Sequence, residues 1–449
     1  MDVRTTVVDA RALRERLESH AATVGIIGLG YVGLPLAIAC RSAGFSVIGF
    51  DIDPAKVDDL NRGISPIKHI SNDRVSALRE RECFTATSDF ERLAEPDVIL
   101  ICVPTPLGRH HEPDLSFIEA TARSVAARLR RGQLVVLEST TYPGTTVEVL
   151  KPILENSGLC SGADFFLAYS PEREDPGNID FETSQIPKVV AGDGPEALAL
   201  ACALYDRIVV RTVPVSSPDT AEAVKITENV FRAVNIALVN ELKLVYAAMG
   251  VDIFEVIEAA KTKPFGFMPF YPGPGLGGHC IPIDPFYLTW KAREHGINTR
   301  FIELAGEINT SMPRYVVERL REELDLRFGK GLKGARILIV GVSYKKNVDD
   351  MRESPALTIM ELLDGAGVKV DYHDPHFPVI PPTREHCVLA GKASVPLDSY
   401  LVARYDGAVI VTDHSNVNYD LLLRYSKLVV DTRNVIPGAS QHRRIVAKA

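Results

Sequence analysis

The chain has 449 residues, of which 46% are hydrophobic and 24% are charged. This length accommodates two or three domains with cores of their own, and the composition is that of a globular enzyme. The net charge of −8 argues against nucleic acid as a general partner, because phosphate backbones attract basic surfaces. The seven scattered cysteines are odd in number and contain no CxxC pair, which predicts a reduced, cytoplasmic environment without a disulfide framework.

Residues 1–22 are expected to form a short lead-in helix. Leu13 and Leu17 lie four residues apart among charged residues, as on an amphipathic helix. No apolar core precedes a small-residue cleavage site, so we expect no signal peptide. No apolar run in the sequence is long enough to cross a bilayer, and we expect no membrane partner.

A strand, a glycine-rich turn, a helix and a second strand open the first domain, which we predict over 23–215. The turn reads Gly28-Leu29-Gly30-Tyr31-Val32-Gly33, and the second strand, 46–50, ends at Asp51. In such a unit the three glycines make the turn, admit a pyrophosphate and pack helix on strand, while the acid binds the adenosine ribose hydroxyls. The order of these features predicts dinucleotide binding, and the acid favours NAD because it repels the extra phosphate of NADP.

Three further strands of this domain end in polar or proline-rich loops. The loops cover 104–106, 139–144 and 170–177. Carboxyl ends of parallel strands meet at one edge of a sheet, where ligands bind. The repetition therefore predicts a ligand crevice at this edge, although each loop alone could be an ordinary turn.

A long, mostly apolar helix over 220–249 opens the central region, predicted over 216–323. Such a helix bridges domains or forms a subunit interface. Lys225 and Asn229 lie one turn apart on it among apolar or small neighbours. A partly buried lysine beside an amide suits proton transfer to a hydroxyl or stabilisation of an oxyanion, and the alternative is a solvated pair on an exposed face.

The densest run of glycine and proline, 273–284, surrounds a single cysteine, Cys280. This composition excludes a helix or a central strand and predicts a rigid loop. A cysteine with a lowered pKa is a strong nucleophile, and the glycine amides before it could stabilise a developing negative charge. His279 precedes the cysteine, Asp284 follows it by four residues, and an aromatic segment, 263–272, leads to it. The alternative is a structural turn with a buried thiol.

The last region, predicted over 324–449, repeats the strand–helix rhythm without the glycine fingerprint. Its expected strands cover 336–341, 368–373, 408–412 and 427–430. Three cations follow the ends of these strands: Lys345, Arg352 and Arg433. If they bind phosphate, three cations favour a nucleotide diphosphate as the ligand. The alternative is that each is an ordinary surface charge. The chain is thus predicted to be an α/β protein with two doubly wound Rossmann-like domains, joined by a long central helix and a small helical domain.

The sequence resembles the UDP-glucose/GDP-mannose dehydrogenase family over nearly its whole length beyond the lead-in. The motifs that carry the resemblance are GLGYVG, CVPTP, ESTTYPGTT, SPERxxPG, AExxKxxEN, GPGxGGHCIPxDP and YKKNVDDMRESP. Segments 169–178 and 263–292 are most similar to bacterial enzymes that oxidise UDP-N-acetyl-D-glucosamine for O-antigen or capsule. His279 and Arg173 lie at positions where UDP-glucose enzymes have other residues, which argues against UDP-glucose as the substrate. Enzymes that oxidise UDP-N-acetyl-D-mannosamine share both features, so this sugar remains an alternative substrate.

The resemblance implies a four-electron oxidation of the sugar C6 alcohol to a carboxylate with two NAD, in a cytoplasmic homodimer or larger homo-oligomer, and no metal. Cys280 would add to the first aldehyde product, and a thioester would then be hydrolysed. The implied catalytic residues are Cys280, Lys225, Asn229, Asp284, Glu172 and Thr140. The implied NAD contacts are Gly28, Gly30, Tyr31, Val32, Gly33, Asp51, Thr105 and Thr140. The implied UDP-sugar contacts are Glu172, Arg173, Lys225, Asn229, Tyr271, Gly277, His279, Lys345 and Arg433.

Two other function classes share part of this pattern. A hydroxyacid or 6-phosphogluconate-type dehydrogenase has the dinucleotide domain, the long helix and the lysine–asparagine pair, but transfers one hydride and needs no cysteine. A non-catalytic NAD-binding sensor needs neither the cysteine nor the acids around it. The Cys280 loop and the second nucleotide-type domain argue against both.

Overall fold

The computed structural model of the chain describes residues 10–67, 70–80, 83–108, 112–174, 183–278, 281–383, 385–436, 442 and 444–449. The chain forms two compact units. The first comprises Met1–Glu228 and Phe286–Ile297, and the second comprises Asn229–Pro285 and Asn298–Ala449.

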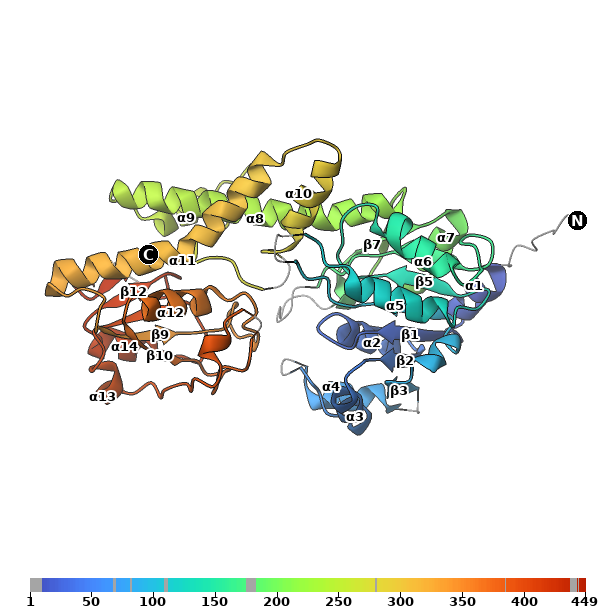
Figure 1. Cartoon of the computed structure of the whole chain (residues 1–449), viewed down its shortest axis with the longest axis horizontal. Coiled ribbons are helices and arrows are strands. Elements are labelled where there is room, and N and C mark those ends of the chain that lie inside the picture. The colour runs from blue at the N-terminus through green and yellow to red at the C-terminus, as the bar shows by residue number, and fades with distance from the viewer. Residues whose placement is uncertain are drawn as a thin grey trace, which may run out of the picture. The chain divides into compact units, whose positions relative to one another are not determined.

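The first unit is built on an eight-stranded sheet with the order β3-β2-β1-β4-β5-β6-β7-β8 (Figure 1). Its strands are β1 (Thr23–Ile27), β2 (Ser46–Phe50), β3 (Phe84–Thr87), β4 (Val98–Ile101), β5 (Leu134–Leu137), β6 (Phe166–Tyr169), β7 (Lys188–Gly192) and β8 (Thr212–Pro214). The first six strands are parallel, whereas β7 runs antiparallel to β6 and parallel to β8. This reversal departs from the parallel rhythm that the sequence suggests.

Two hydrophobic clusters lie on the two faces of this sheet. Leu134 and Val136 belong to one cluster, and Val135 and Leu137 belong to the other, as expected where successive side chains of a strand alternate. The helices are α1 (Ala10–Glu18), α2 (Gly33–Ser42), α3 (Pro54–Arg62), α4 (Asn72–Leu78), α5 (Ser116–Ala126), α6 (Lys151–Glu155) and α7 (Pro195–Tyr205), with short turns η2 (Phe90–Ala94), η3 (Thr145–Leu150) and η4 (Thr183–Gln185). Burial on both faces explains why the central strands are apolar throughout.

The second unit contains a five-stranded parallel sheet with the order β10-β9-β11-β12-β13. Its strands are β9 (Arg336–Val340), β10 (Lys369–His373), β11 (Gly407–Ile410), β12 (Val429–Asp431) and β13 (Val446–Lys448), and its shorter helices are α12 (Pro355–Gly365), α13 (Ser399–Val402), α14 (Tyr419–Tyr425) and η5 (Cys387–Leu389). Clusters again cover both faces. The two sheets confirm the predicted fold class.

The central region is helical, with α8 (Pro218–Ala248), α9 (Ile253–Ala260), α10 (Asp284–Glu294) and α11 (Arg300–Phe328). Helix α8 begins earlier than the predicted residue 220, and the N–H of Thr220 donates to the hydroxyl of Ser217 at 3.2 Å, so Ser217 caps the helix. Gly250 ends it with φ +73°. Helix α11 passes residue 323, where a domain boundary is predicted, and the division into domains stays a prediction.

Across the ranges that the structure describes, no helix is long and apolar enough to cross a membrane. Six cysteines there are free thiols, of which Cys160 and Cys387 are exposed. Cys280 and His279 lie outside the described residues.

Candidate active site

The glycine-rich turn after β1 leaves space at its second glycine. Gly28 has φ +91°, and a Cβ there would lie 2.5 Å from the carbonyl oxygen of Cys102. A Cβ on Gly33 would lie 1.8 Å from the carbonyl oxygen of Gly28, whereas a Cβ on Gly30 would meet no atom within 4 Å. These three positions fit the tight turn, the close phosphate approach and the helix packing that a bound dinucleotide requires.

The predicted ribose-binding acid lies beside this turn. Asp51 follows β2, is 6% exposed, and its Oδ2 accepts hydrogen bonds from the N–H of Leu29 at 2.9 Å and from Lys56 Nζ at 2.8 Å. Lys56 belongs to α3 and was not singled out in the sequence, because a single lysine on a helix is most often solvated. The acid therefore lies beside the glycine-rich turn with Lys56 as its partner, and its contact with the ribose stays a prediction.

The loops after β4 and β5 are joined at the same sheet edge. The hydroxyl of Thr105 donates to the carbonyl oxygen of Thr140 at 2.8 Å, and the hydroxyl of Ser139 donates to that of Val103 at 2.7 Å. The hydroxyl of Tyr287, on α10, donates to the carbonyl oxygen of Thr105. The structure thus brings together two residues that the sequence assigns to NAD binding.

Glu172 follows β6 at this edge and is buried. Its Oε1 accepts from the N–H groups of Arg173 and Glu174, both at 2.7 Å, and its Oε2 accepts from Lys188 Nζ at 3.3 Å. Burial alone would raise the pKa of Glu172, but Lys188, the two N–H groups and Lys225 bring this pKa below its usual value. Glu172 is therefore an ionised carboxylate at neutral pH.

The loop after β5 is also tied to α8, through a residue the sequence reasoning missed. Glu222 is fully buried and accepts from the N–H of Gly144 at 2.6 Å and from the N–H of Thr146 at 2.8 Å. Burial raises the pKa of Glu222 to about 7, although these hydrogen bonds oppose the shift. Its place in the AExxKxxEN motif, three residues before Lys225, was the available signal.

Two predicted substrate contacts are paired with acids of their own unit. Arg173 Nη2 lies 2.5 Å from Glu228 Oε1, and its Nη1 donates to the carbonyl oxygen of Pro187 at 2.8 Å. The hydroxyl of Tyr271, which is 45% exposed, donates to Glu258 Oε1 at 2.7 Å. To contact a sugar, either side chain must break its hydrogen bond to the acid and form one to the ligand.

In the second unit, three segments meet at Gly273, in the loop that leads to the predicted nucleophile. The N–H of Gly273 donates to Asn240 Oδ1 at 3.0 Å, and its carbonyl accepts from Lys243 Nζ at 3.2 Å. Asn240 in turn donates to Asn309 of α11 at 3.0 Å. A Cβ on Gly273 would lie 2.8 Å from Arg433 Nη1, so a side chain there would displace the guanidinium.

The same loop packs on the segment that follows β9. A Cβ on Gly277 would lie 2.6 Å from Cβ of Tyr344, and the N–H of Gly278 donates to the carbonyl oxygen of Arg352 at 3.0 Å. This segment carries Lys345. The structure thus gathers the loop and the two predicted UDP ligands, Lys345 and Arg433, within one unit.

Beyond the loop, two predicted catalytic side chains are in contact. Asn229 Nδ2, on α8, donates to Asp284 Oδ2, at the start of α10, with a distance of 2.5 Å. Both are buried. This short hydrogen bond fixes the orientation of both groups.

Two cations, one buried and one partly buried, lie near Gly273. Lys243 is 4% exposed, and burial and the nearby Arg433 lower the pKa of Lys243 to about 7. Burial also lowers the pKa of Arg433. An anionic group beside them would favour both charged forms, which suits a diphosphate.

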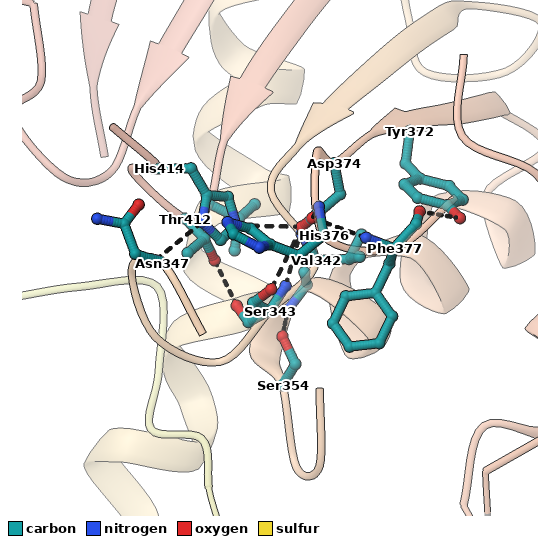
Figure 2. A network of polar contacts seen from close by, with 12 residues as sticks. Val342, Ser343, Asn347, Ser354, Tyr372, Asp374, His376, Phe377, Thr412 and His414 are labelled. Atoms are coloured by element: carbon teal, nitrogen blue, oxygen red, sulfur yellow. Dashed lines mark hydrogen bonds and ion pairs between the residues drawn. The ribbon is translucent and has the colours of Figure 1, made fainter. Parts of the chain in front are cut away.

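A buried acid anchors the segment after β9 (Figure 2). Asp374 Oδ2 accepts from the N–H of Val342 at 2.6 Å and lies 3.1 Å from His414 Nε2. His414 Nδ1 accepts from the N–H of Asn347 at 3.0 Å, so the ring nitrogen that faces the acid, Nε2, carries a proton and donates it to Asp374. Burial alone would raise the pKa of Asp374, but His414 and backbone N–H groups lower it to about 2. Lys345 is therefore carried by a clamped segment.

Comparison with known proteins identifies matches along the whole chain. Three sequence models of the UDP-glucose/GDP-mannose dehydrogenase family match: its NAD binding domain at 22–209, its central domain at 219–311 and its UDP binding domain at 338–438. The chain is 37% identical over 394 residues to UDP-N-acetyl-D-glucosamine 6-dehydrogenase of Pseudomonas aeruginosa, covering 87% of this chain and 90% of that protein.

Solved structures show the same architecture. UDP-D-ManNAc dehydrogenase of Pyrococcus horikoshii superposes with a TM-score of 0.83 at 35% identity, covering 93% of this chain and 96% of that one. A UDP-glucose dehydrogenase of Pyrobaculum islandicum superposes with a TM-score of 0.82 at 27% identity, covering 95% and 96%. These similar proteins are named for different sugars.

Proposed function

The chain belongs to the UDP-glucose/GDP-mannose dehydrogenase family and is an NAD-dependent UDP-sugar dehydrogenase, and on this premise we propose that it oxidises C6 of UDP-N-acetyl-D-glucosamine to the uronic acid. Segments 169–178 and 263–292 support this sugar. Relatives named for UDP-N-acetyl-D-mannosamine are 34% to 36% identical, which keeps that sugar as the alternative, with UDP-glucose as a third.

In the proposed mechanism Cys280 is the nucleophile. The C6 alcohol loses a proton and a hydride and becomes an aldehyde. The Cys280 thiolate adds to its carbonyl carbon, and the adduct loses a second hydride and becomes a thioester. Water then displaces the thiolate and leaves the carboxylate. When bound, NAD accepts one hydride at each oxidation, two per sugar.

The other proposed catalytic side chains hold the C6 oxygen of the sugar or transfer protons. Lys225 and Asn229 hold the C6 oxygen, Asp284 orients Asn229, and Glu172 takes the proton of the attacking water, with Thr140 near the reacting carbon. The single observation that best supports this arrangement is the 2.5 Å hydrogen bond between Asn229 and Asp284, because Asp284 lies four residues after Cys280.

The second unit supplies the contacts proposed for UDP. Lys345 and Arg433 contact the diphosphate, Gly277 and His279 contact the sugar, and Tyr271 lies at the approach to it. The position of Arg433 beside Gly273, where it is partly buried, supports this assignment, because a partly desolvated charge is stabilised by an anionic ligand.

The assembly is proposed to be a homodimer built on α8. Phe231, Leu238 and Val245 are spaced by seven residues, lie on one face of the helix and are 42% to 50% exposed. A second copy would cover these side chains. Light scattering should give twice the chain mass, and Leu238→Glu should shift the protein to monomer; a monomeric wild type at working concentration contradicts the proposal.

The reaction is proposed to take place in the cytoplasm and to supply a uronic acid precursor for O-antigen or capsule. Its support is that similar proteins are named as nucleotide-sugar dehydrogenases and that the described cysteines are free thiols.

The decisive measurement is the number of NADH formed per sugar consumed with each of the three UDP-sugars. Two per UDP-N-acetyl-D-glucosamine supports the proposal, and two with the mannosamine sugar alone changes the substrate only. One per sugar would favour a single-hydride dehydrogenase. Cys280→Ala should lose acid formation almost entirely, while Cys160→Ala, which removes an exposed thiol, should keep the wild-type rate.

A further inference from the structure

A buried lysine lies between two carboxylates at the ligand edge of the first sheet. Lys188 Nζ is 2.8 Å from Glu138 Oε2 and 3.3 Å from Glu172 Oε2, and the side chains of Lys188 and Glu138 are 4% and 0% exposed. The hydroxyl of Tyr205 donates to Glu138 Oε1, and Lys188 Nζ lies 5.2 Å from the centre of the Tyr205 ring. The mechanism described so far uses Glu172 but none of the other three.

The reversed strand β7 explains how the lysine reaches this edge. β7 pairs antiparallel with β6, with Tyr169 opposite Ala191. Continuing this register by three residues beyond the end of β6 sets Lys188 opposite Glu172. The first residue of a parallel strand would lie at the far edge of the sheet, whereas the first residue of β7 lies where Glu138 follows β5 and Glu172 follows β6.

The two carboxylates share one cation unequally. Glu138 is fully buried, and burial raises its pKa although Lys188 opposes the shift. Glu172 also receives two backbone N–H groups and the field of Lys225, and its pKa is lowered. The buried thiol of Cys102 also interacts with Glu172, and burial chiefly raises the pKa of this thiol, so that it stays neutral. The only counter-charge in contact with Glu172 among the described residues is Lys188.

We propose that Lys188 is a positioning residue that keeps Glu172 ionised and fixes its Oε2, so that Glu172 can act as the base in thioester hydrolysis. The inference rests on the role proposed above for Glu172. In that step the water oxygen bonds to the thioester carbon, the bond from this carbon to Cys280 Sγ breaks, and the water proton passes to Glu172. A protonated Glu172 cannot accept that proton, so the step requires the charge that Lys188 stabilises.

The test is the pH profile of kcat in Lys188→Met, at saturating NAD and UDP-sugar. Without the ammonium, burial raises the pKa of Glu172, so the acidic limb should move to higher pH by about one unit or more. The rate should fall in mildly acidic solution, where the wild type still turns over, and should recover as the pH rises. Lys188→Arg keeps the charge and should restore the wild-type limb.

A second variant gives a shift of opposite sign. Glu138→Gln removes the negative charge 2.8 Å from Lys188, which leaves the ammonium to Glu172 alone, so the limb should move to lower pH. This variant also serves if Lys188→Met does not fold. Lys151→Met is the matched control, because Lys151 pairs with Asp193 at 2.9 Å elsewhere in the same unit and should leave the profile unchanged.

Two readouts separate the inference from the proposed function. Intact-protein mass spectrometry at turnover should show a UDP-sugar acyl adduct accumulating in Glu172→Gln, and in Lys188→Met below its shifted limb. No adduct in any variant would overturn the covalent mechanism. An unshifted limb in Lys188→Met, or a uniform loss of rate at every pH, would overturn the role of Lys188 whether or not the adduct forms.

Discussion

The two sheets begin in the same way and then use their ligand edges differently. Gly28 after β1 and Gly341 after β9 have φ of +91° and +84°. A Cβ at these positions would lie 2.5 Å and 2.4 Å from the carbonyl oxygens of Cys102 and Thr412, which follow the neighbouring strands β4 and β11. In both sheets glycine is required because the turn after the first strand packs against the end of the neighbouring strand, β4 in one sheet and β11 in the other.

Each sheet also has an acid after its second strand that accepts an N–H of this turn. Asp51 accepts from Leu29 at 2.9 Å, and Asp374 accepts from Val342 at 2.6 Å. The partner of Asp51 is Lys56, whose side chain is 27% exposed, whereas His414, the partner of Asp374, is fully buried.

The length of the connection decides what occupies the edge. The first turn reaches its helix at Gly33, but the second runs fourteen residues to α12 and fills the edge with its own chain. The comparison teaches that one architecture binds a dinucleotide where the turn is short and the partner of the acid is partly exposed, and builds a clamped cationic segment where the connection is long and that partner is buried.

The largest effect is expected from Asp374→Asn. Its pKa is lowered from 3.8 to about 2, so the acid contributes about 2 kcal/mol above pH 4, and this contribution is lost as pH falls toward 2. Urea unfolding at pH 7 should give the variant a free energy of unfolding that is lower than that of the wild type by at least this amount. The difference should become smaller as the pH falls, and NAD affinity should not change. Asp364→Asn, at an exposed site, is the control. Equal stability of Asp374→Asn and wild type at pH 7 would show that the buried acid does not anchor the segment.

Asp51→Asn should affect only the ligand edge of the first sheet, where NAD binds. A hydrogen bond to a charged group contributes about 1.5 kcal/mol, so NAD affinity should fall roughly tenfold. Discrimination against NADP should fall as well, because the repelling charge is gone and Lys56 remains. Titration calorimetry with both dinucleotides measures this, and Asp53→Asn, which keeps a helix cap, is the control. Unchanged NAD binding would remove Asp51 from the cofactor contacts.

Gly30→Ala should give the smallest effect. Its Cβ meets no protein atom within 4 Å, so the free energy of unfolding should change by less than about 0.5 kcal/mol. NAD affinity should fall several-fold, because the methyl group takes space needed by the pyrophosphate. Thermal unfolding and NAD titration of one sample separate the two effects. A strong loss of stability would mean that the open space is needed by the protein itself.

The features predicted from sequence are those with a local cause. The turn Gly28–Gly33, Asp51 and the strand ends are encoded by neighbours in the chain, and the structure has them where expected. Helix α11 was missed because Pro313 lies within it, and an internal proline usually ends a helix.

The missed site residues have partners that are distant in sequence. Lys188 acts on Glu138 across 50 residues, and Asp374 on His414 across 40. A single sequence carries no sign of such a pairing, and the reversal of β7 cannot be read from its apolar pattern, because strands of either direction are alike when buried on both faces.

The reversed strand also constrains the order of assembly. Docking β7 before β5 and β6 are in place would bury the ammonium of Lys188 without Glu138 and Glu172, at a cost of several kcal/mol. The strand should therefore join a sheet that already exists. In pulsed hydrogen exchange during refolding, the amides of Val189–Ala191 should gain protection after those of β5 and β6.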